Sequence, residues 1–182
     1  MDGVFAMQDY YAKGGFRFSH RNLRYEVDVP AEAANAPVDD HVVPLATVSL
    51  DDVLAYDRRC FPAQRQTFVE RWIAQPDAAA VGYVTDIGLR GYGVARRCRV
   101  GCKIGPLLAD DGDVAEALFA ALSGFAAGGP VFLDAPENHP AAMALVAHHR
   151  MREVFGCARM YIGGVPDIDH DRIFGVTTFE LG

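Results

Sequence analysis

One run of the sequence, residues 79–148, constrains the fold of this 182-residue chain more than any other part. At its centre, residues 113–127 carry apolar side chains at helical spacing, and Gly128-Gly129 ends the predicted helix. Three predicted strands precede it, at 79–85, 91–98 and 102–109, and the short turns between them favour an antiparallel meander. A short buried strand at 131–135 and a last helix with Pro140 in its first turn follow.

The flanking regions complete this pattern. A predicted strand at 42–47 precedes a helix that begins at Ser49, which has capping-box spacing to Asp52. A second helix runs from about Gln64 to Gln75. Strands at 152–162 and 173–181 finish the chain. The predicted order from residue 42 is therefore β-α-α-β-β-β-α-β-α-β-β.

Composition excludes several classes of protein. The chain is 51% apolar and 23% charged with a net charge of −7, which predicts one compact globular domain and no nucleic-acid partner. No apolar run approaches the roughly 20 residues that cross a bilayer, and no leader pattern precedes the first strand. We therefore expect a cytoplasmic protein with no membrane partner.

The four cysteines are too scattered to predict a disulfide framework. Cys98 and Cys102 are four residues apart, but zinc would need two further ligands at compatible spacing. No metal is expected.

The element order and two segments resemble the GNAT superfamily of acyl-CoA-dependent N-acetyltransferases over about residues 42–182. CRVGCKIGPLLADDGDVAEALFAAL and VFLDAPENHPAAMALVAHHRMREVF resemble the core of that superfamily, and most of all the second module of bacterial tandem-GNAT proteins. The resemblance implies an α+β fold (α/β in some schemes) with a mixed central sheet of six or seven strands and about four helices. It also implies that the fourth and fifth strands, 102–109 and 131–135, splay apart.

The N-terminal segment adds to the resemblance. YAKGGF, residues 11–16, resembles the helix-ending Tyr-Glu-Lys-x-Gly-Phe motif of the superfamily, and residues 16–26 resemble the strand after it. This implies that residues 1–30 end a preceding GNAT domain, that 31–41 are a linker, and that 42–182 form a GNAT-like domain. Because a leftover strand has an unpaired edge, we expect it to pair with the intact domain or with a second copy, as a homodimer.

The resemblance implies acetyl-CoA as co-substrate. In the superfamily, free amides of the fourth strand bind the pantetheine arm, and a loop at a helix N-terminus binds the pyrophosphate. The matching positions here are Leu107, Leu108, Ala109, Gly112, Val114, Ala115 and Asn138. Pro106 suits either a splayed strand or a bent edge. Asn138 matches an asparagine that contacts the CoA arm, and it also fits a helix cap.

The pyrophosphate loop departs from the family pattern. Its basic residue is absent, and Asp110, Asp111 and Asp113 flank the turn. These carboxylates either repel a diphosphate or act as favourable caps of the following helix. The sequence leaves both interpretations open.

Catalytic and acceptor residues are less clearly marked. Val146 stands where the family has a tyrosine proton donor, so the candidates are Tyr161, His148 and His149, the histidines being equally suited to a surface or capping role. YDRRCFPAQRQTFVERW resembles the acceptor-lining region and supplies the pocket candidates Asp57, Cys60 and Arg65. Asp57 and Arg65 also fit an ordinary ion pair.

The sequence therefore predicts an acetyl-CoA-dependent N-acetyltransferase that transfers acetyl directly to an amine of a small molecule or protein. The alternative is a non-catalytic GNAT-like accessory or dimerisation domain with a degenerate CoA site. An open splay with free amides would favour the enzyme, and a filled splay would favour the accessory domain.

Overall fold

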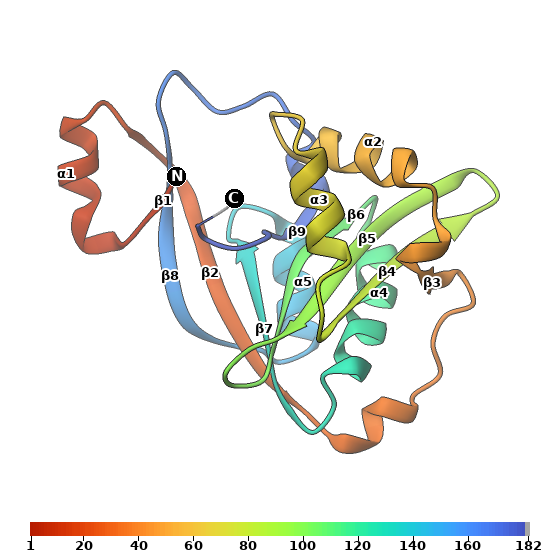
Figure 1. Cartoon of the computed structure of the whole chain (residues 1–182). Helices are drawn as coiled ribbons and strands as arrows, with labels where there is room; N and C mark the ends of the chain where they lie inside the picture. Colours follow the sequence, from red (N-terminus) through yellow and green to blue (C-terminus); the bar gives the residue numbers. More distant parts are fainter. Residues whose placement is uncertain (181–182) are drawn as a thin grey trace.

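The computed structural model describes residues 1–180, which form one mixed sheet with helices on both faces (Figure 1). Within these residues the sheet has nine strands in the order β1-β8-β2-β7-β6-β5-β4-β3, with β9 beside β6. The strands are β1 (Asp2–Gly3), β2 (Arg17–Val29), β3 (Val42–Pro44), β4 (Ala78–Thr85), β5 (Gly88–Arg97), β6 (Cys102–Ala109), β7 (Gly129–Pro136), β8 (Arg152–Tyr161) and β9 (Ile173–Gly175). The helices are α1 (Gln8–Lys13), α2 (Leu50–Cys60), α3 (Gln66–Ile73), α4 (Gly112–Phe125) and α5 (Pro140–His148), with 3₁₀ turns η1 (Phe5–Met7), η2 (Ala31–Asn35), η3 (Leu45–Thr47) and η4 (His170–Arg172).

The α+β class and the core of the predicted order are confirmed. β4, β5 and β6 form the expected antiparallel meander, and β7 then pairs parallel with β6. In the described part of the chain, residues from 42 onward supply seven strands, and the N-terminal segment adds β1 and β2. None of the described helices has the length and apolar character needed to span a membrane.

Three local predictions are wrong, and one is confirmed in part. The strand at 42–47 ends at Pro44, which lacks the N–H needed to continue the ladder, and a 3₁₀ turn follows. The last strand ends at Gly175, and Leu181, its predicted end, lies outside the described residues. Ser49 is the N-cap of α2, but its side chain makes no capping hydrogen bond. His139, and not Asn138, is the N-cap of α5, because Pro140 fixes the first helical residue.

The N-terminal strand lies inside the sheet. β2 runs antiparallel to β7 from Asn22↔Pro136 to Val29↔Gly129, and its other edge pairs with β8. Leu23 of β2 is buried against Gly156 of β8. A Cβ added to Gly156 would stand 2.7 Å from Cδ2 of Leu23. The predicted pairing with the intact domain is therefore confirmed. The homodimer and the assignment of residues 1–30 to a preceding domain stay predictions.

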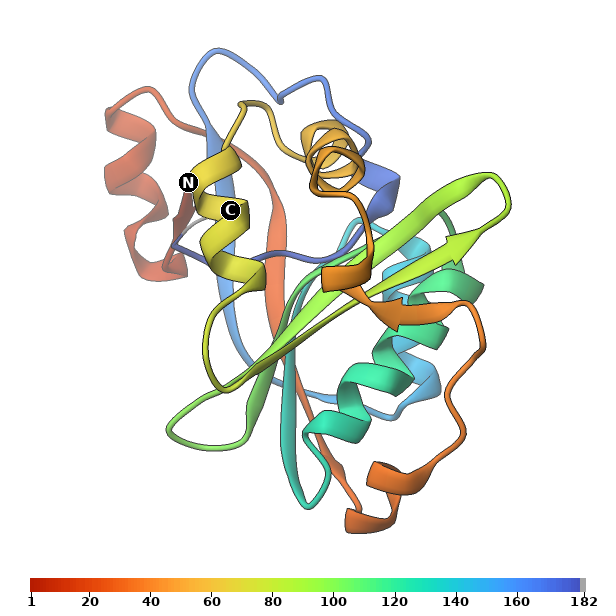
Figure 2. The ribbon, with the colours of Figure 1, turned by 45° about the vertical axis from the view of Figure 1, so that its right-hand side comes forward.

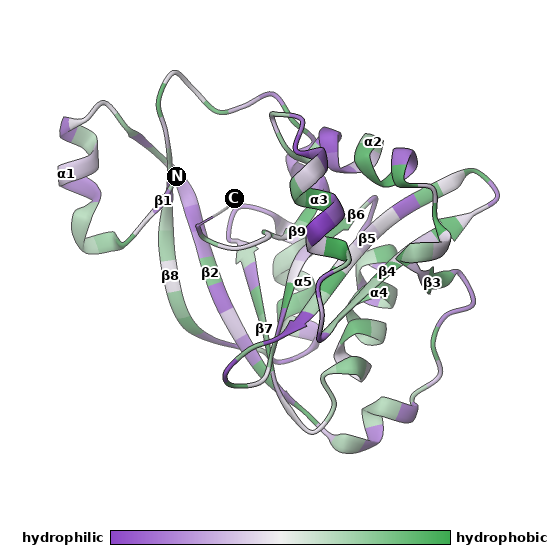
Figure 3. Cartoon of the chain, in the orientation of Figure 1, coloured by the Kyte–Doolittle hydropathy of each residue, from purple (hydrophilic) through white to green (hydrophobic). Residues whose placement is uncertain are grey.

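Helices cover both faces of the sheet in Figure 2, and a layer of core side chains lies on each face. Leu107 faces the layer built by α4 and α5, whereas its neighbour Leu108 faces the layer built by α2 and α3. This alternation is the period of two that a strand imposes. α4 is apolar along most of its length in Figure 3, which fits its four side chains of 0 or 1% exposure, Ala115, Leu118, Phe119 and Leu122.

A charged cluster lies within this sheet. Asp134 of β7 is 0% exposed and accepts two hydrogen bonds from Arg24 of β2, at 2.6 and 2.8 Å. Lys103 of β6, 3% exposed, places its Nζ 2.6 Å from the Asp134 Oδ2 atom. Burial lowers the pKa of Lys103, and the Asp134 carboxylate opposes that shift. Asp134 therefore compensates two cations that belong to separate strands.

We predict that Asp134→Asn destabilises the fold by roughly 3–5 kcal/mol, because it leaves the buried Lys103 and the half-buried Arg24 without their counter-charge. Urea unfolding measures the loss. Arg152→Gln, which breaks the exposed ion pair of Arg152 with Glu26, is the matched control and should change the free energy of unfolding by less than about 1 kcal/mol. Equal effects of the two substitutions would contradict a structural role for the cluster.

Candidate functional site: a filled splay and an adjoining cavity

The fourth and fifth strands of the family pattern, β6 and β7, splay apart as expected. They pair only at Cys102↔Val131, Lys103↔Phe132 and Ile104↔Leu133. Beyond that point β9 lies between them. It pairs antiparallel with β6 at Leu107↔Gly175 and Leu108↔Ile173, and the Val176 N–H donates to the Asp134 carbonyl oxygen at 2.9 Å.

The fit of this segment is close. A Cβ added to Gly105 would stand 2.5 Å from the Thr177 carbonyl oxygen, and one added to Gly175 would stand 2.5 Å from Cδ1 of Leu133. Both glycines therefore permit an approach that no other residue would allow. Lys103 Nζ also donates to the Thr177 carbonyl oxygen at 3.4 Å. We call residues 162–180 the strap; its part from 173 to 177 fills the splay.

In the acidic loop, residues 110–113, the Asp111 carboxylate finds its hydrogen-bond partner within the chain. Asp111 is the N-cap of α4, and its carboxylate accepts a hydrogen bond from the Val114 N–H at 3.0 Å. It thus takes the position at the helix N-terminus where an anion would bind. Gly112 begins α4, and the side chains of Val114 and Ala115 are buried in the core. The capping interpretation of Asp111 is confirmed.

Asp110 ties this loop to the strap. Its carboxylate accepts from Arg90 Nε at 2.7 Å and from the Tyr56 hydroxyl at 2.8 Å, and it forms an ion pair with Arg172 of η4. Arg172 also binds Asp169 within the strap. The aspartates of the loop are therefore partly neutralised, by two arginines that sequence spacing could not associate with them.

A cavity of about 480 Å³ adjoins the filled splay. Of the predicted site residues, five line it: Cys60, Arg65, Leu108, Asn138 and Tyr161. The strap closes one side with Pro166, Ile168, Val176 and Phe179, and the ends of β1, β2 and β8 close another. Its volume lies within the range of small-molecule sites.

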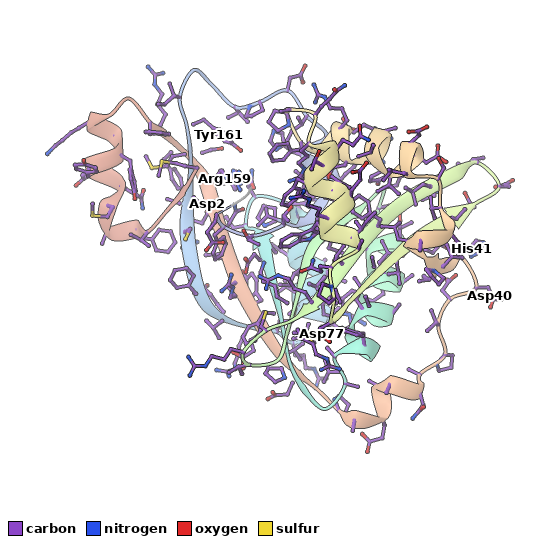
Figure 4. The ribbon with its side chains drawn as sticks, in the orientation of Figure 1. Asp2, Asp40, His41, Asp77, Arg159 and Tyr161 are labelled. Atoms are coloured by element: carbon purple, nitrogen blue, oxygen red, sulfur yellow. The ribbon has the colours of Figure 1, made fainter. Side chains whose placement is uncertain are left out.

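The wall near Tyr161 is an ordered polar cluster. Arg159 forms an ion pair with Asp2 at 2.6 Å, and Asn22 Nδ2 donates to Asp2 Oδ1 at 2.8 Å. Figure 4 shows Asp2, Arg159 and Tyr161 grouped where β1 meets β8. Burial raises the pKa of Tyr161, so its phenol is protonated at neutral pH.

The acceptor-side candidates divide into two roles. Asp57 does not line the cavity; it is buried, accepts two hydrogen bonds from Arg65 at 2.9 and 2.7 Å, and accepts one from the Tyr92 hydroxyl at 2.7 Å. Arg65 is thereby fixed at the cavity wall, 3.9 Å above the Phe61 ring. Burial, followed by the charge of Asp57, raises the pKa of Cys60 to about 12. Its thiol is therefore not a nucleophile at neutral pH.

Sequence reasoning missed three histidines of the cavity, His20, His139 and His170. His20 of β2 is buried with Nδ1 3.0 Å from the Ser19 hydroxyl, and His139 places Nδ1 3.1 Å from the Ile173 carbonyl oxygen of the strap. Burial first, then the charge of Arg159, lowers the pKa of His20 to about 4. The strand alternation places His20 and Asn22 on one face, but only the pairing with β8 shows what they face.

The other candidates lie elsewhere. His148 and His149 stand at the C-terminal end of α5, where His149 binds Glu116 of α4 at 2.9 Å. Neither belongs to the cavity lining, and among the described residues the same is true of Leu107, Ala109, Gly112, Val114 and Ala115. As catalytic groups for this cavity, the two histidines are misplaced.

Comparison with known proteins agrees with this architecture. The family described as Acetyltransferase (GNAT) domain matches residues 53–175, and the chain therefore belongs to it. The holothin acyltransferase of Pseudoalteromonas sp. (strain SANK 73390) is 28% identical over 185 residues, which cover all of this chain and 61% of that protein.

Solved structures share the fold. A Pyrococcus horikoshii protein provisionally assigned as an acetyltransferase superimposes with a TM-score of 0.80 at 23% identity, covering 100% of this chain and 59% of its own. A GCN5-related N-acetyltransferase from Sphaerobacter thermophilus gives a TM-score of 0.56 at 15% identity, covering 90% and 60%. The chain thus spans about three fifths of the length of these relatives.

We predict that the state of His20 makes the fold sensitive to acid. The unfolded chain protonates His20 near pH 6.5 and the folded chain only near pH 4, so the unfolded state binds more protons between these values. The contribution of His20 to stability is therefore present above about pH 6.5 and lost as the pH falls towards 4. His20→Gln should flatten this part of a plot of unfolding free energy against pH. A His20→Gln curve parallel to the original would contradict the assignment.

Proposed function

We propose that this chain is the acceptor-binding module of a GNAT-type acyltransferase, with a degenerate CoA site. The observation that carries the proposal is the position of β9, which pairs with β6 at Leu107 and Leu108. These are positions where the family resemblance requires free amides for pantetheine. Acetyl-CoA therefore does not fit the splay while the strap is in place.

Charge supports the same conclusion. The carboxylate of Asp111 holds the N-terminus of α4, where the family binds pyrophosphate. Arg90 and Arg172, the cations beside the loop, already bind Asp110. A diphosphate would have to displace one carboxylate and compete with another for the same guanidinium groups.

The cavity supports a role in binding the acceptor. Its strap wall combines apolar side chains with the carboxylates of Asp171 and Glu180. Its two arginines are neutralised by Asp57 and Asp2. An uncharged, largely apolar amine suits such a site better than an anion, because a buried charge without a partner is costly. The name of the Pseudoalteromonas relative assigns it acyl transfer to holothin, and we propose acyl transfer to an amine for the protein to which this module belongs.

The second candidate is a complete acetyl-CoA-dependent N-acetyltransferase whose strap is displaced by the cofactor. One observation favours it: Leu108 of β6 and Asn138 after β7 line the cavity next to the filled splay. Removal of β9 would therefore join the cavity to the splay, with the Tyr161 phenol in the same space.

Calorimetric titration with acetyl-CoA at moderate salt separates the two candidates. We predict no saturable binding, because β9 and Asp111 hold the two places that the cofactor needs. Saturable micromolar binding would contradict the proposal. In that case, Gly112→Glu would weaken binding if the loop is used and leave the affinity unchanged if it is not.

A second titration tests the acceptor site with 5-aminoindole, an apolar aromatic amine that is neutral at pH 7.5. We predict saturable binding that Ile168→Trp weakens at least about tenfold, because the larger side chain fills the cavity. Ile162→Trp is the matched control; it makes the same change on the same strap at a side chain that is 61% exposed. No binding, or equal loss in both variants, would contradict an acceptor site at this cavity.

A further inference from the structure

A cluster of nitrogen and oxygen donors lies outside the cavity, where α4 meets the end of α5. Glu116, His148 and His149 each offer one ligand atom, and all three atoms lie within 4.8 Å of one another. His149 Nε2 stands 2.9 Å from both carboxylate oxygens of Glu116. The two histidine rings are nearly perpendicular, at 87°, with their centroids 5.0 Å apart.

Packing holds the His149 ring of this cluster in place without a bound ion. The ring of His149 lies 4.4 Å from that of Phe119, a residue of α4 that is 1% exposed. Glu116 precedes Phe119 by three residues, which places both on neighbouring positions of one helix face. His148 is exposed and is free to rotate towards the other two. Zinc–nitrogen and zinc–oxygen bonds are about 2.0–2.2 Å long. A small movement of the side chains would therefore bring the three ligand atoms to these distances from one shared ion.

The electrostatic setting favours a cation. Glu116 supplies a formal negative charge, and the C-terminal end of α5, at His148 and His149, carries the negative pole of the helix dipole. Asp113 lies three residues before Glu116 on α4 and adds a second negative charge nearby. The cation of the neighbouring residue Arg150 opposes this field.

We infer that Glu116, His148 and His149 form a surface site for a divalent zinc ion that joins α4 to the end of α5. Two imidazoles and one carboxylate are a donor set that Zn²⁺ accepts, with water at the remaining position. The site is independent of the cavity and of the filled splay, so it stands whether or not this module binds an acceptor.

The test is calorimetric titration of tag-free, EDTA-treated protein with zinc chloride at pH 7.5. We expect one saturable site per chain, and we expect zinc to raise the Tm, because only the folded state brings the two helices together. His148→Ala removes an exposed ligand without disturbing the core and should weaken binding at least about tenfold. Glu116→Gln keeps the side-chain shape and should weaken it by a similar factor.

His41→Ala is the matched control. His41 is an exposed histidine paired with an acidic residue, Asp39, at 2.9 Å, and its loss should leave zinc affinity unchanged. Cobalt supplies a second readout, because histidine and carboxylate ligation gives d–d bands without thiolate absorption. Absence of saturable zinc binding, affinity unchanged in both His148→Ala and Glu116→Gln, or a thiolate band from a cysteine such as Cys98 would each overturn the inference.

Discussion

Asp134 holds together three parts of the chain that are far apart in sequence. Its buried carboxylate binds Arg24 of β2 and Lys103 of β6, and its carbonyl oxygen accepts the N–H of Val176 in the strap. Burying the ionised groups of Asp134 and Lys103 beside the half-buried Arg24 is costly in itself, and such a cluster adds little net stability over an apolar one. What it provides is register: β2 between β7 and β8, and β9 between β6 and β7, are both fixed at this residue.

The strap changes what a GNAT fold offers to a ligand. Pantetheine and a peptide strand both present amide groups along an extended backbone, so a strand such as β9 can occupy the same edge of β6. The Asp111 carboxylate similarly occupies the anion position of α4. Under our proposal the surface for the cofactor is replaced by these internal partners, while the adjoining cavity stays open. Fold membership alone would not have shown this, because function depends on the site and not on the fold.

Local signals in the sequence were enough to predict the meander and the long helix α4. For the N-terminal strand they left pairing within the domain and pairing with a second copy both open. The family resemblance named Cys60 and Arg65 as acceptor-pocket residues, Asn138 as a CoA contact and Tyr161 as a catalytic candidate. Only the structure places all four on one cavity. The failures concern contacts between distant segments. Nothing near Asp110 marks Arg172 as its partner, and nothing near Gly105 shows that Thr177 approaches its backbone. His148 and His149 were catalytic candidates because of their residue type. They lie at the C-terminal end of α5, whereas His139, which lines the cavity, lies at its N-terminal end.

The filled splay is tested most directly by hydrogen exchange of the segment from 173 to 177, measured by mass spectrometry with and without acetyl-CoA. The structure predicts that the Val176 amide, bound to the Asp134 carbonyl, exchanges as slowly as the amides of the β6–β7 pair, and that acetyl-CoA leaves this protection unchanged. Exchange of this segment at the rate of an exposed loop, or loss of its protection when acetyl-CoA is added, would contradict the account and would show that the strap is displaced to admit the cofactor.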